Sequence, residues 1–135
     1  MIEKTVSANK KVKDVMTHDF TIINGLTTVK EAINIARSNN IKMLIIDKRD
    51  ENDEFGLVLM NDIAKKVLSK NRAAERVNLY EIMSKPAFSV PPSMNVKYCA
   101  RFFERFGISR APVIENNQVL GVVSYNSIVL QGMLD

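Results

Sequence analysis

The sequence is poor in the residue types on which most catalytic and metal chemistry depends. Its 135 residues include one cysteine and one histidine, so neither an internal disulfide nor a histidine-based metal cluster is available. No glycine-rich phosphate loop, Ser-His-Asp order or pair of catalytic carboxylates stands out. The sequence therefore gives no positive support to an enzymatic activity and predicts no metal site. A lone cysteine, Cys99, beside seven methionines is typical of a reducing, cytoplasmic compartment.

Long hydrophobic runs are missing too. The apolar runs at Leu44–Ile46 and Leu57–Met60 are far too short to cross a membrane. The opening residues, Met1–Lys13, alternate polar and apolar side chains, which is not the pattern of a secretion signal. Apolar residues make up 46% and charged residues 25%, as in ordinary globular proteins. The net charge of +4 suits an anionic partner, but alone it predicts neither a nucleotide nor a nucleic acid.

An internal repeat accounts for nearly the whole chain. Val12–Met16 reappears as Leu79–Met83, 67 positions later. The segments that follow correspond in the same order: Thr21–Gly25 with Phe88–Pro92, Val29–Ala32 with Val96–Cys99, Met43–Asp47 with Ala111–Glu115, and Phe55–Val58 with Leu120–Val123. A recurrence at this period indicates two copies of one structural unit.

Each copy carries the same series of secondary-structure signals. In the first, β-branched and apolar runs predict strands at Phe20–Ile23, Met43–Asp47 and Phe55–Met60, with a charged turn between the last two. Thr28 and Glu31 form a capping-box pattern that opens a helix. Asn61 is expected to cap a second helix, whose apolar face carries Ile63, Ala64, Val67 and Leu68.

The second copy adds two stop signals. A helix from about Val96 to Phe106 is expected to end at Gly107, the usual residue for a left-handed cap. Asn116-Asn117 suits a tight hairpin between the last two strands. The order β-α-β-β-α, found twice, predicts an α+β (α/β-like) fold of two pseudo-symmetric repeats packed through their sheets. We assign 1–11 to a tail, 12–71 to the first repeat and 72–135 to the second, the two repeats together forming one module.

The repeated segments resemble a known family. The resemblance rests on Ile82–Pro86, Ser89–Pro92, Gly107–Ile114 and Leu120–Ser124, with Val15–Thr17, Leu44–Asp47 and Gly56–Val58 in the first copy. In this order and spacing, the chain resembles a tandem pair of cystathionine β-synthase-type (CBS) domains, the Bateman module, from about Val12 to Leu134. Paired CBS domains usually bind AMP, ADP, ATP or S-adenosylmethionine in clefts between the two copies. They regulate other proteins and commonly form homodimers.

The resemblance also implies which residues hold a ligand. The family's ribose–phosphate motif is Gly, two apolar residues, Ser or Thr, two further residues and Asp. The first copy keeps the carboxylate as Asp62 but has Leu59 in place of the hydroxyl, and the second keeps the hydroxyl as Ser124 but has Ser127 in place of the carboxylate. Each pocket therefore retains one of the two polar groups of the motif, the carboxylate in the first copy and the hydroxyl in the second. Losing one charge-assisted hydrogen bond to ribose corresponds to roughly 1.5–3 kcal/mol, or about one to two decades in affinity.

Other positions complete the expected sites. A basic residue just before the second strand reaches phosphate in family members, and we assign this place to Arg110 in the second copy and Lys42 in the first. Ser127 or Asn126 is a weak substitute for the missing ribose acceptor. The base pocket is lined by the first strand of the opposite copy: Phe88, Ser89 and Val90 for the Asp62 site, and Thr21, Ile22 and Ile23 for the Ser124 site.

Structural roles compete with several of these assignments. Asp62 suits the first turn of a helix because a carboxylate there is favourable against the helix dipole, and Ser124 suits a helix cap. His18 is expected to be exposed and Cys99 to be a buried, small apolar residue. The acidic run within Lys48–Glu54 lacks the ligand spacing and central glycine of a calcium loop, so we expect a solvated turn. Phe102, Phe103 and Phe106 are expected in the core or an interface.

Three functions remain open from the sequence. The first is a stand-alone regulatory CBS pair that binds an adenosine-containing ligand as a cytoplasmic homodimer and signals to an unknown partner protein. The second is a degenerate pair that serves dimerisation or interaction without a nucleotide. The third, nucleic-acid binding, ranks last because no basic stripe is evident.

Overall fold

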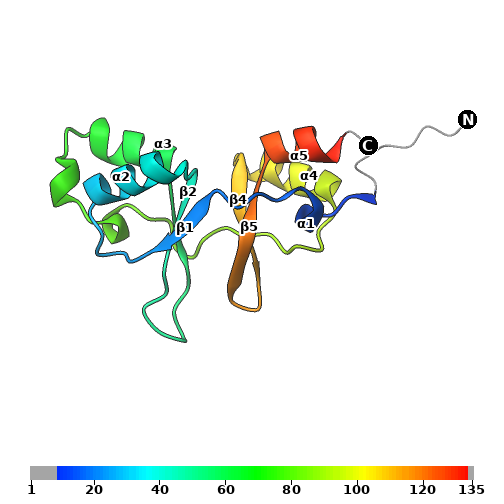
Figure 1. The fold of residues 1–135 in the computed structure, drawn as a ribbon, viewed down its shortest axis with the longest axis horizontal. Helices are drawn as coiled ribbons and strands as arrows, with labels where there is room; N and C mark the ends of the chain where they lie inside the picture. The colour runs from blue at the N-terminus through cyan, green and yellow to red at the C-terminus, as the bar shows by residue number, and fades with distance from the viewer. Residues whose placement is uncertain (1–8, 134–135) are drawn as a thin grey trace, which may run out of the picture. The chain divides into compact units, whose positions relative to one another are not determined.

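Residues 9–133 are described by the computed structural model, and they form two compact units (Figure 1). The first unit is Asp19–Phe88, and the second unit combines residues 9–18 with residues 89–133. We describe each unit by itself. The expectations for residues 1–8 of the tail, and for the last two residues of the second repeat, lie outside the described part of the chain.

A three-stranded sheet forms the centre of the first unit. Strand β1 (Phe20–Ile23) runs parallel to β2 (Met43–Ile46), and β3 (Gly56–Leu59) is antiparallel to β2 on its other side. Helix α2 (Val29–Asn39) makes the crossover that parallel strands require. All four residues of β2 are buried, which explains why this strand is a continuous apolar run rather than an alternating one.

The predicted capping box of α2 is confirmed. The Thr28 hydroxyl accepts a hydrogen bond from the Glu31 N–H at 3.2 Å, and the Glu31 carboxylate accepts from the Thr28 N–H at 3.4 Å. The helix ends at Asn40 in the left-handed conformation (φ 53°), and it buries Val29, Ala32 and Ala36.

The second helix of this unit differs from the prediction. Helix α3 (Met60–Ile63) continues as a π-helical turn, η2 (Ala64–Leu68). Asn61 lies inside α3 and does not cap it. The helix begins at Met60, and the Asp62 carboxylate accepts the N–H of Leu59, the residue at the cap position, at 2.8 Å. Of the predicted apolar face, Ile63 and Val67 are buried, whereas Ala64 is exposed and Leu68 is 77% exposed.

The second unit is built around a hairpin of β4 (Arg110–Glu115) and β5 (Gln118–Ser124). Asn116 and Asn117, both at positive φ, make the predicted tight turn. Helix α4 (Val96–Phe106) ends at the left-handed Gly107 (φ 66°), also as predicted, and α5 (Tyr125–Gly132) follows β5. The strand expected near residue 90 is reduced to one parallel bridge, Val90 with Val113, because two prolines without N–H donors follow it.

Each unit is completed by the opening segment of the other repeat. In the second unit, the N–H of Val12 in α1 (Val12–Val15) donates to the Met94 carbonyl at 2.8 Å. In the first unit, the N–H of Leu79 in η4 (Leu79–Glu81) donates to the Thr27 carbonyl at 2.9 Å. Donors and acceptors in the two bonds are both 67 positions apart, so the two bonds are equivalent. The segment ahead of η4 includes a 3-10 turn, η3 (Ala74–Arg76).

Both of these segments contribute to the cores. Val12 and Val15 are at most 1% exposed within the second unit's core, and Leu79 and Ile82 are at most 2% exposed within the first unit's core. The α+β class and the pseudo-symmetry of the repeats are thus confirmed. Within residues 9–133, no helix has the length and apolar character needed to cross a bilayer.

The compact units predict how fragments of this protein behave. A fragment of residues 19–88 retains Leu79 and Ile82 and is expected to unfold cooperatively on heating. A fragment of residues 12–71 lacks both side chains and is expected to show no cooperative transition by circular dichroism. Within 19–88, Leu79→Ala is expected to cost about 2–5 kcal/mol, as for other buried leucines. A cooperative transition in 12–71 equal to that of 19–88 would contradict this division of the chain.

Candidate functional site

Asp62 lies at the start of α3, directly after the carboxyl end of β3. Its side chain is partly buried, and one carboxylate oxygen accepts the Leu59 N–H. The sequence assigned two competing roles to this residue, and the first-turn role is visible in this hydrogen bond. A carboxylate has two oxygens and several acceptor positions, so this bond leaves room for a ligand hydroxyl.

Ser124 and Ser127 form a closed hydrogen-bond pair at the start of α5. The Ser124 hydroxyl accepts the Ser127 N–H at 3.1 Å, and the Ser127 hydroxyl accepts the Ser124 N–H at 3.0 Å. The Ser127 hydroxyl also donates to the Ser124 carbonyl at 3.1 Å, and the residue is only 6% exposed. Ser127 therefore serves the helix start in this structure, whereas Asn126 beside it is exposed.

Arg110 and Ser124 are brought together by the hairpin. They are directly opposed in the antiparallel register of β4 and β5, and both are partly buried. Opposed residues of such a pair have Cβ atoms about 4.5–5.5 Å apart. A guanidinium and a hydroxyl at a helix start are a combination suited to an anion.

Lys42 does not occupy the position equivalent to Arg110. Equivalent backbone bonds, Asp47 N–H to the Ile23 carbonyl and Ile114 N–H to the Val90 carbonyl, align the second strands of the two units at an offset of 67. Met43, opposite Leu59, is then the counterpart of Arg110, and Lys42 is one residue earlier and exposed. The sequence match of Met43–Asp47 with Ala111–Glu115 was thus wrong by one residue, because apolar runs align equally well in either register.

The strand segments expected to line a base fall in both units. Thr21, Ile22 and Ile23 form most of β1 at the edge of the first unit's sheet, where Ile22 is 44% exposed. Phe88, also 44% exposed, closes the first unit, while Ser89 and Val90 belong to the second unit. Val90 is buried against β4 and Ser89 is exposed.

The remaining candidates have structural roles. Cys99 is fully buried, and burial raises the pKa of its thiol to about 11, so it stays protonated and unreactive at neutral pH. His18 is exposed. Phe103 lies in the second unit's core, but Phe106 is 49% exposed. No group of three or more metal-ligating side chains occurs among residues 9–133.

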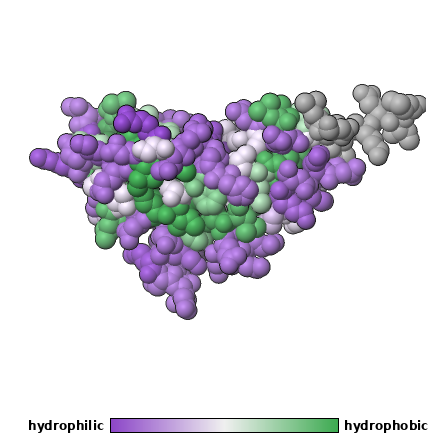
Figure 2. Space-filling view, in the orientation of Figure 1, coloured by the Kyte–Doolittle hydropathy of each residue, from purple (hydrophilic) through white to green (hydrophobic). Residues whose placement is uncertain are grey.

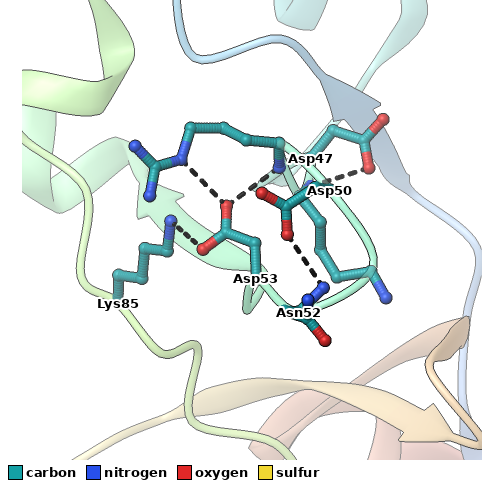
Figure 3. Close-up of polar contacts among 7 residues, drawn as sticks. Asp47, Asp50, Asn52, Asp53 and Lys85 are labelled. Atoms are coloured by element: carbon teal, nitrogen blue, oxygen red, sulfur yellow. Dashed lines mark hydrogen bonds and ion pairs between the residues drawn. The ribbon is translucent and has the colours of Figure 1, made fainter.

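The loop between β2 and β3 holds an ion-pair cluster that the sequence did not reveal. Figure 3 shows the Lys85 ammonium directed at the Asp53 carboxylate, with an Nζ–Oδ1 distance of 2.6 Å. The other oxygen of Asp53 accepts from the Arg49 backbone N–H at 2.9 Å and from its Nε at 3.2 Å. Asp50 accepts the Asn52 N–H in the same loop.

This cluster corrects the expectation of a fully solvated turn. Hydrophilic residues cover the tip of the loop (Figure 2), and Asp50 and Glu51 are exposed, but the Asp53 side chain is only 9% exposed. The hydrogen bond from Lys85, followed by the backbone N–H of Arg49, holds the pKa of Asp53 well below its usual range. Lys85 is 32 positions away, so local sequence patterns carried no signal for the contact.

The ion pair makes stability depend on pH. Because the folded pKa of Asp53 is lowered, its contribution is fully present above the unfolded pKa, about 4, and is lost as the pH falls below it. We expect Asp53→Asn to lower the melting temperature at pH 7 and to have a progressively smaller effect between pH 4 and the acid limit of the fold. Asp50→Asn is the matched control in the same loop. Equal melting temperatures for Asp53→Asn and the unmodified protein at pH 7 would contradict this assignment.

Comparisons with known proteins agree with this architecture. The family model described as "CBS domain" matches twice, at residues 12–69 and 79–131. A curated relative, protein MK0525 of Methanopyrus kandleri, is 28% identical over 113 residues; the match covers 80% of this chain and 56% of the relative's length.

Two solved structures are also similar. The hexameric CBS-CP12 protein of bloom-forming cyanobacteria is 33% identical with a TM-score of 0.86, covering 91% of this chain and 71% of that one. The CBS domain pair of protein MJ0100, solved with 5′-methylthioadenosine and S-adenosyl-L-methionine, is 26% identical with a TM-score of 0.75, covering 90% and 98%. With the family model matched on both repeats, the chain belongs to the CBS domain family as a tandem pair.

Proposed function

We propose that this CBS pair is a non-catalytic regulatory module that binds an adenosine-containing ligand. The observation that carries the proposal is Asp62, a partly buried carboxylate held at the start of α3 by the Leu59 N–H. The MJ0100 pair, which has the same fold, was solved with two ligands that contain adenosine. The candidates for this chain are AMP, ADP, ATP, S-adenosylmethionine and its thioether derivatives.

The Asp62 site of the first copy and the Ser124 site of the second recognise different parts of an adenosine-containing ligand. Asp62 accepts hydrogen bonds from the ribose hydroxyls, and charge assistance makes these bonds stronger than neutral ones. Arg110 and Ser124, opposed across the hairpin, face a phosphate or carboxylate group. For the base, the candidate contacts are the first strand segments, Thr21, Ile22 and Ile23 in one copy and Phe88, Ser89 and Val90 in the other. Lys42, exposed at the start of β2, is an outer contact for anionic groups.

Regulation follows from differential binding. A ligand that binds one arrangement of the two repeats more tightly shifts the population toward that arrangement, and a partner protein that contacts the module responds to the shift. The module acts in this way in the cytoplasm on a partner protein, without chemistry of its own.

Isothermal titration with AMP, ADP, ATP, S-adenosylmethionine and 5′-methylthioadenosine tests the proposal. For the ligand that binds, we expect Asp62→Asn to weaken affinity roughly 10- to 100-fold, because it removes the charge from the ribose hydrogen bonds. The substitution retains an oxygen that can accept the Leu59 N–H, so it separates binding from helix capping. Asp14→Asn is the matched control, since Asp14 accepts the Lys11 N–H at 2.9 Å in the same way at the start of α1.

Two results would contradict the proposal. One is the absence of heat and of a thermal shift with every ligand. The other is equal loss of affinity in Asp62→Asn and Asp14→Asn, which would show that the effect is structural.

A second candidate function is self-association without a ligand. Its observation is the set of exposed apolar side chains on α4, on α5 and directly after α5, where Tyr98 is 60%, Leu130 66% and Met133 56% exposed. Where such side chains form one continuous patch, they mark an interaction surface. The CBS-CP12 relative is a hexamer, and for this chain we propose a homodimer that uses these helices.

Charge placed on this surface tests the homodimer. We expect Tyr98→Asp and Leu130→Asp to shift the protein from dimer to monomer in sedimentation velocity, with at least a tenfold increase in the dissociation constant of the dimer. Lys97→Asp, also exposed on α4, controls for the added charge. A monomeric parent protein, or dimers unaffected by either substitution, would contradict this candidate.

A further inference from the structure

A pocket of about 630 Å³ opens in the first unit at the carboxyl ends of β1 and β2. Its lining comes from residues 24–26, residues 46–49, Tyr80, Met83 and Lys85. All of these residues belong to the first unit, so the pocket is formed within one compact body. The volume is in the range of sites that hold small molecules.

This pocket is separate from the Asp62 site. Lys42 and Met43 mark the amino end of β2, where Leu59 is opposed to Met43 and leads into α3. The pocket begins at Ile46, at the other end of the same strand. The three steps from Met43 to Ile46 span about 10 Å of extended strand, so a ligand in the pocket would not occupy the place assigned to ribose.

The apolar wall depends on close packing of the turn after β1. The Gly25 carbonyl accepts the Tyr80 N–H at 3.0 Å, and a Cβ at Gly25 would lie 3.2 Å from both the Ile46 side chain and the Tyr80 Cβ. Ile46 is 2% exposed and forms part of the base, whereas Leu26 is 70% and Tyr80 50% exposed. The pocket therefore presents an aromatic ring and an aliphatic side chain to whatever enters.

Positive charge lines the other side. The lining includes three cations, Lys48, Arg49 and Lys85, and one carboxylate, Asp47; with Asp53, which pairs with Arg49 and Lys85, the ratio is three to two. Asp53 pairs with the Lys85 ammonium, the Arg49 backbone N–H and the Arg49 Nε, which fixes the part of the loop that carries these cations and leaves the two terminal nitrogens of Arg49 outside these contacts. The Arg49 side chain remains 82% exposed.

The aromatic ring and the three cations of the pocket are not required by the fold, because the second unit lacks them. At the offset of 67, the counterparts of Lys48, Arg49 and Lys85 are Glu115, Asn116 and His18. The counterpart of Tyr80 is Lys13. The combination of an aromatic wall and three cations is a property of the first unit.

We propose that this pocket is a further ligand site, distinct from the Asp62 and Ser124 sites, which takes a phosphate monoester attached to an aromatic or aliphatic body. Tyr80 and Leu26 cover the body of the ligand. Arg49 and Lys48 bind the phosphate oxygens, to which a guanidinium can donate two parallel hydrogen bonds. Lys85, held in place by Asp53, adds an N–H donor beside them.

Phenyl phosphate is a suitable probe, with inorganic phosphate and phenol as its two halves. In two-dimensional NMR of the full chain, we expect saturable shifts of the Gly25, Lys48 and Arg49 amides by about 5 mM phenyl phosphate, a range in which millimolar binding is measurable. Each half alone is expected to bind at least tenfold more weakly. Arg49→Gln is expected to lower the affinity for phenyl phosphate about tenfold.

The controls separate this site from the Asp62 site. Arg101 is another exposed arginine beside an aromatic ring, with its Cζ 5.7 Å from the centre of the Tyr98 ring. Arg101→Gln should therefore leave phenyl phosphate binding unchanged. Asp62→Asn should also leave it unchanged, and Arg49→Gln should leave the titration with adenosine ligands unchanged. Three results would overturn the proposal: no saturable shifts, equal binding of inorganic phosphate alone, or shifts confined to residues 59–62 and 124–127.

Discussion

The rest of this structure depends on one set of hydrogen bonds. They attach the opening segment of each repeat to the unit that the other repeat forms. The bonds from Val12 to Met94 and from Leu79 to Thr27 set the segments in register. They place four apolar side chains, Val12, Val15, Leu79 and Ile82, into the two cores. They also bring Tyr80, Met83 and Lys85 beside the first unit's sheet, where these residues line its pocket.

Much of the fold was readable from local patterns. The capping box of Thr28 and Glu31, the stop at Gly107 and the turn at Asn116-Asn117 each depend on a few neighbouring residues, and the structure has all three. Local patterns failed where longer-range contacts decide. The register of β2 against its neighbours, which separates Lys42 from Met43, is fixed by pairing across strands. The pairing of Asp53 with Lys85 depends on a segment 32 positions away.

The candidate sites show the same limit. The sequence proposed Asp62, Ser124 and Arg110 as candidates, and the structure adds the hydrogen bonds of Asp62 and Ser124 and the strand register of Arg110. The first unit keeps an acceptor whose second oxygen is not needed by the helix, while the second unit keeps a cation opposed to a hydroxyl. Ser127 is occupied by its own helix start, a role that depends on rotamer and burial and is not visible in a motif. The two repeats have thus diverged in chemistry while keeping equivalent backbones.

The exchange of opening segments has an evolutionary consequence. A chain that held only one repeat would carry the segment that completes its partner and lack the one that completes itself. Such an ancestor could bury its core only as a pair of chains, each supplying its opening segment to the other. Duplication and fusion of the gene would then join two partners that were already dependent on each other. The opening segments would thus make, within one chain, contacts that were once made between separate molecules.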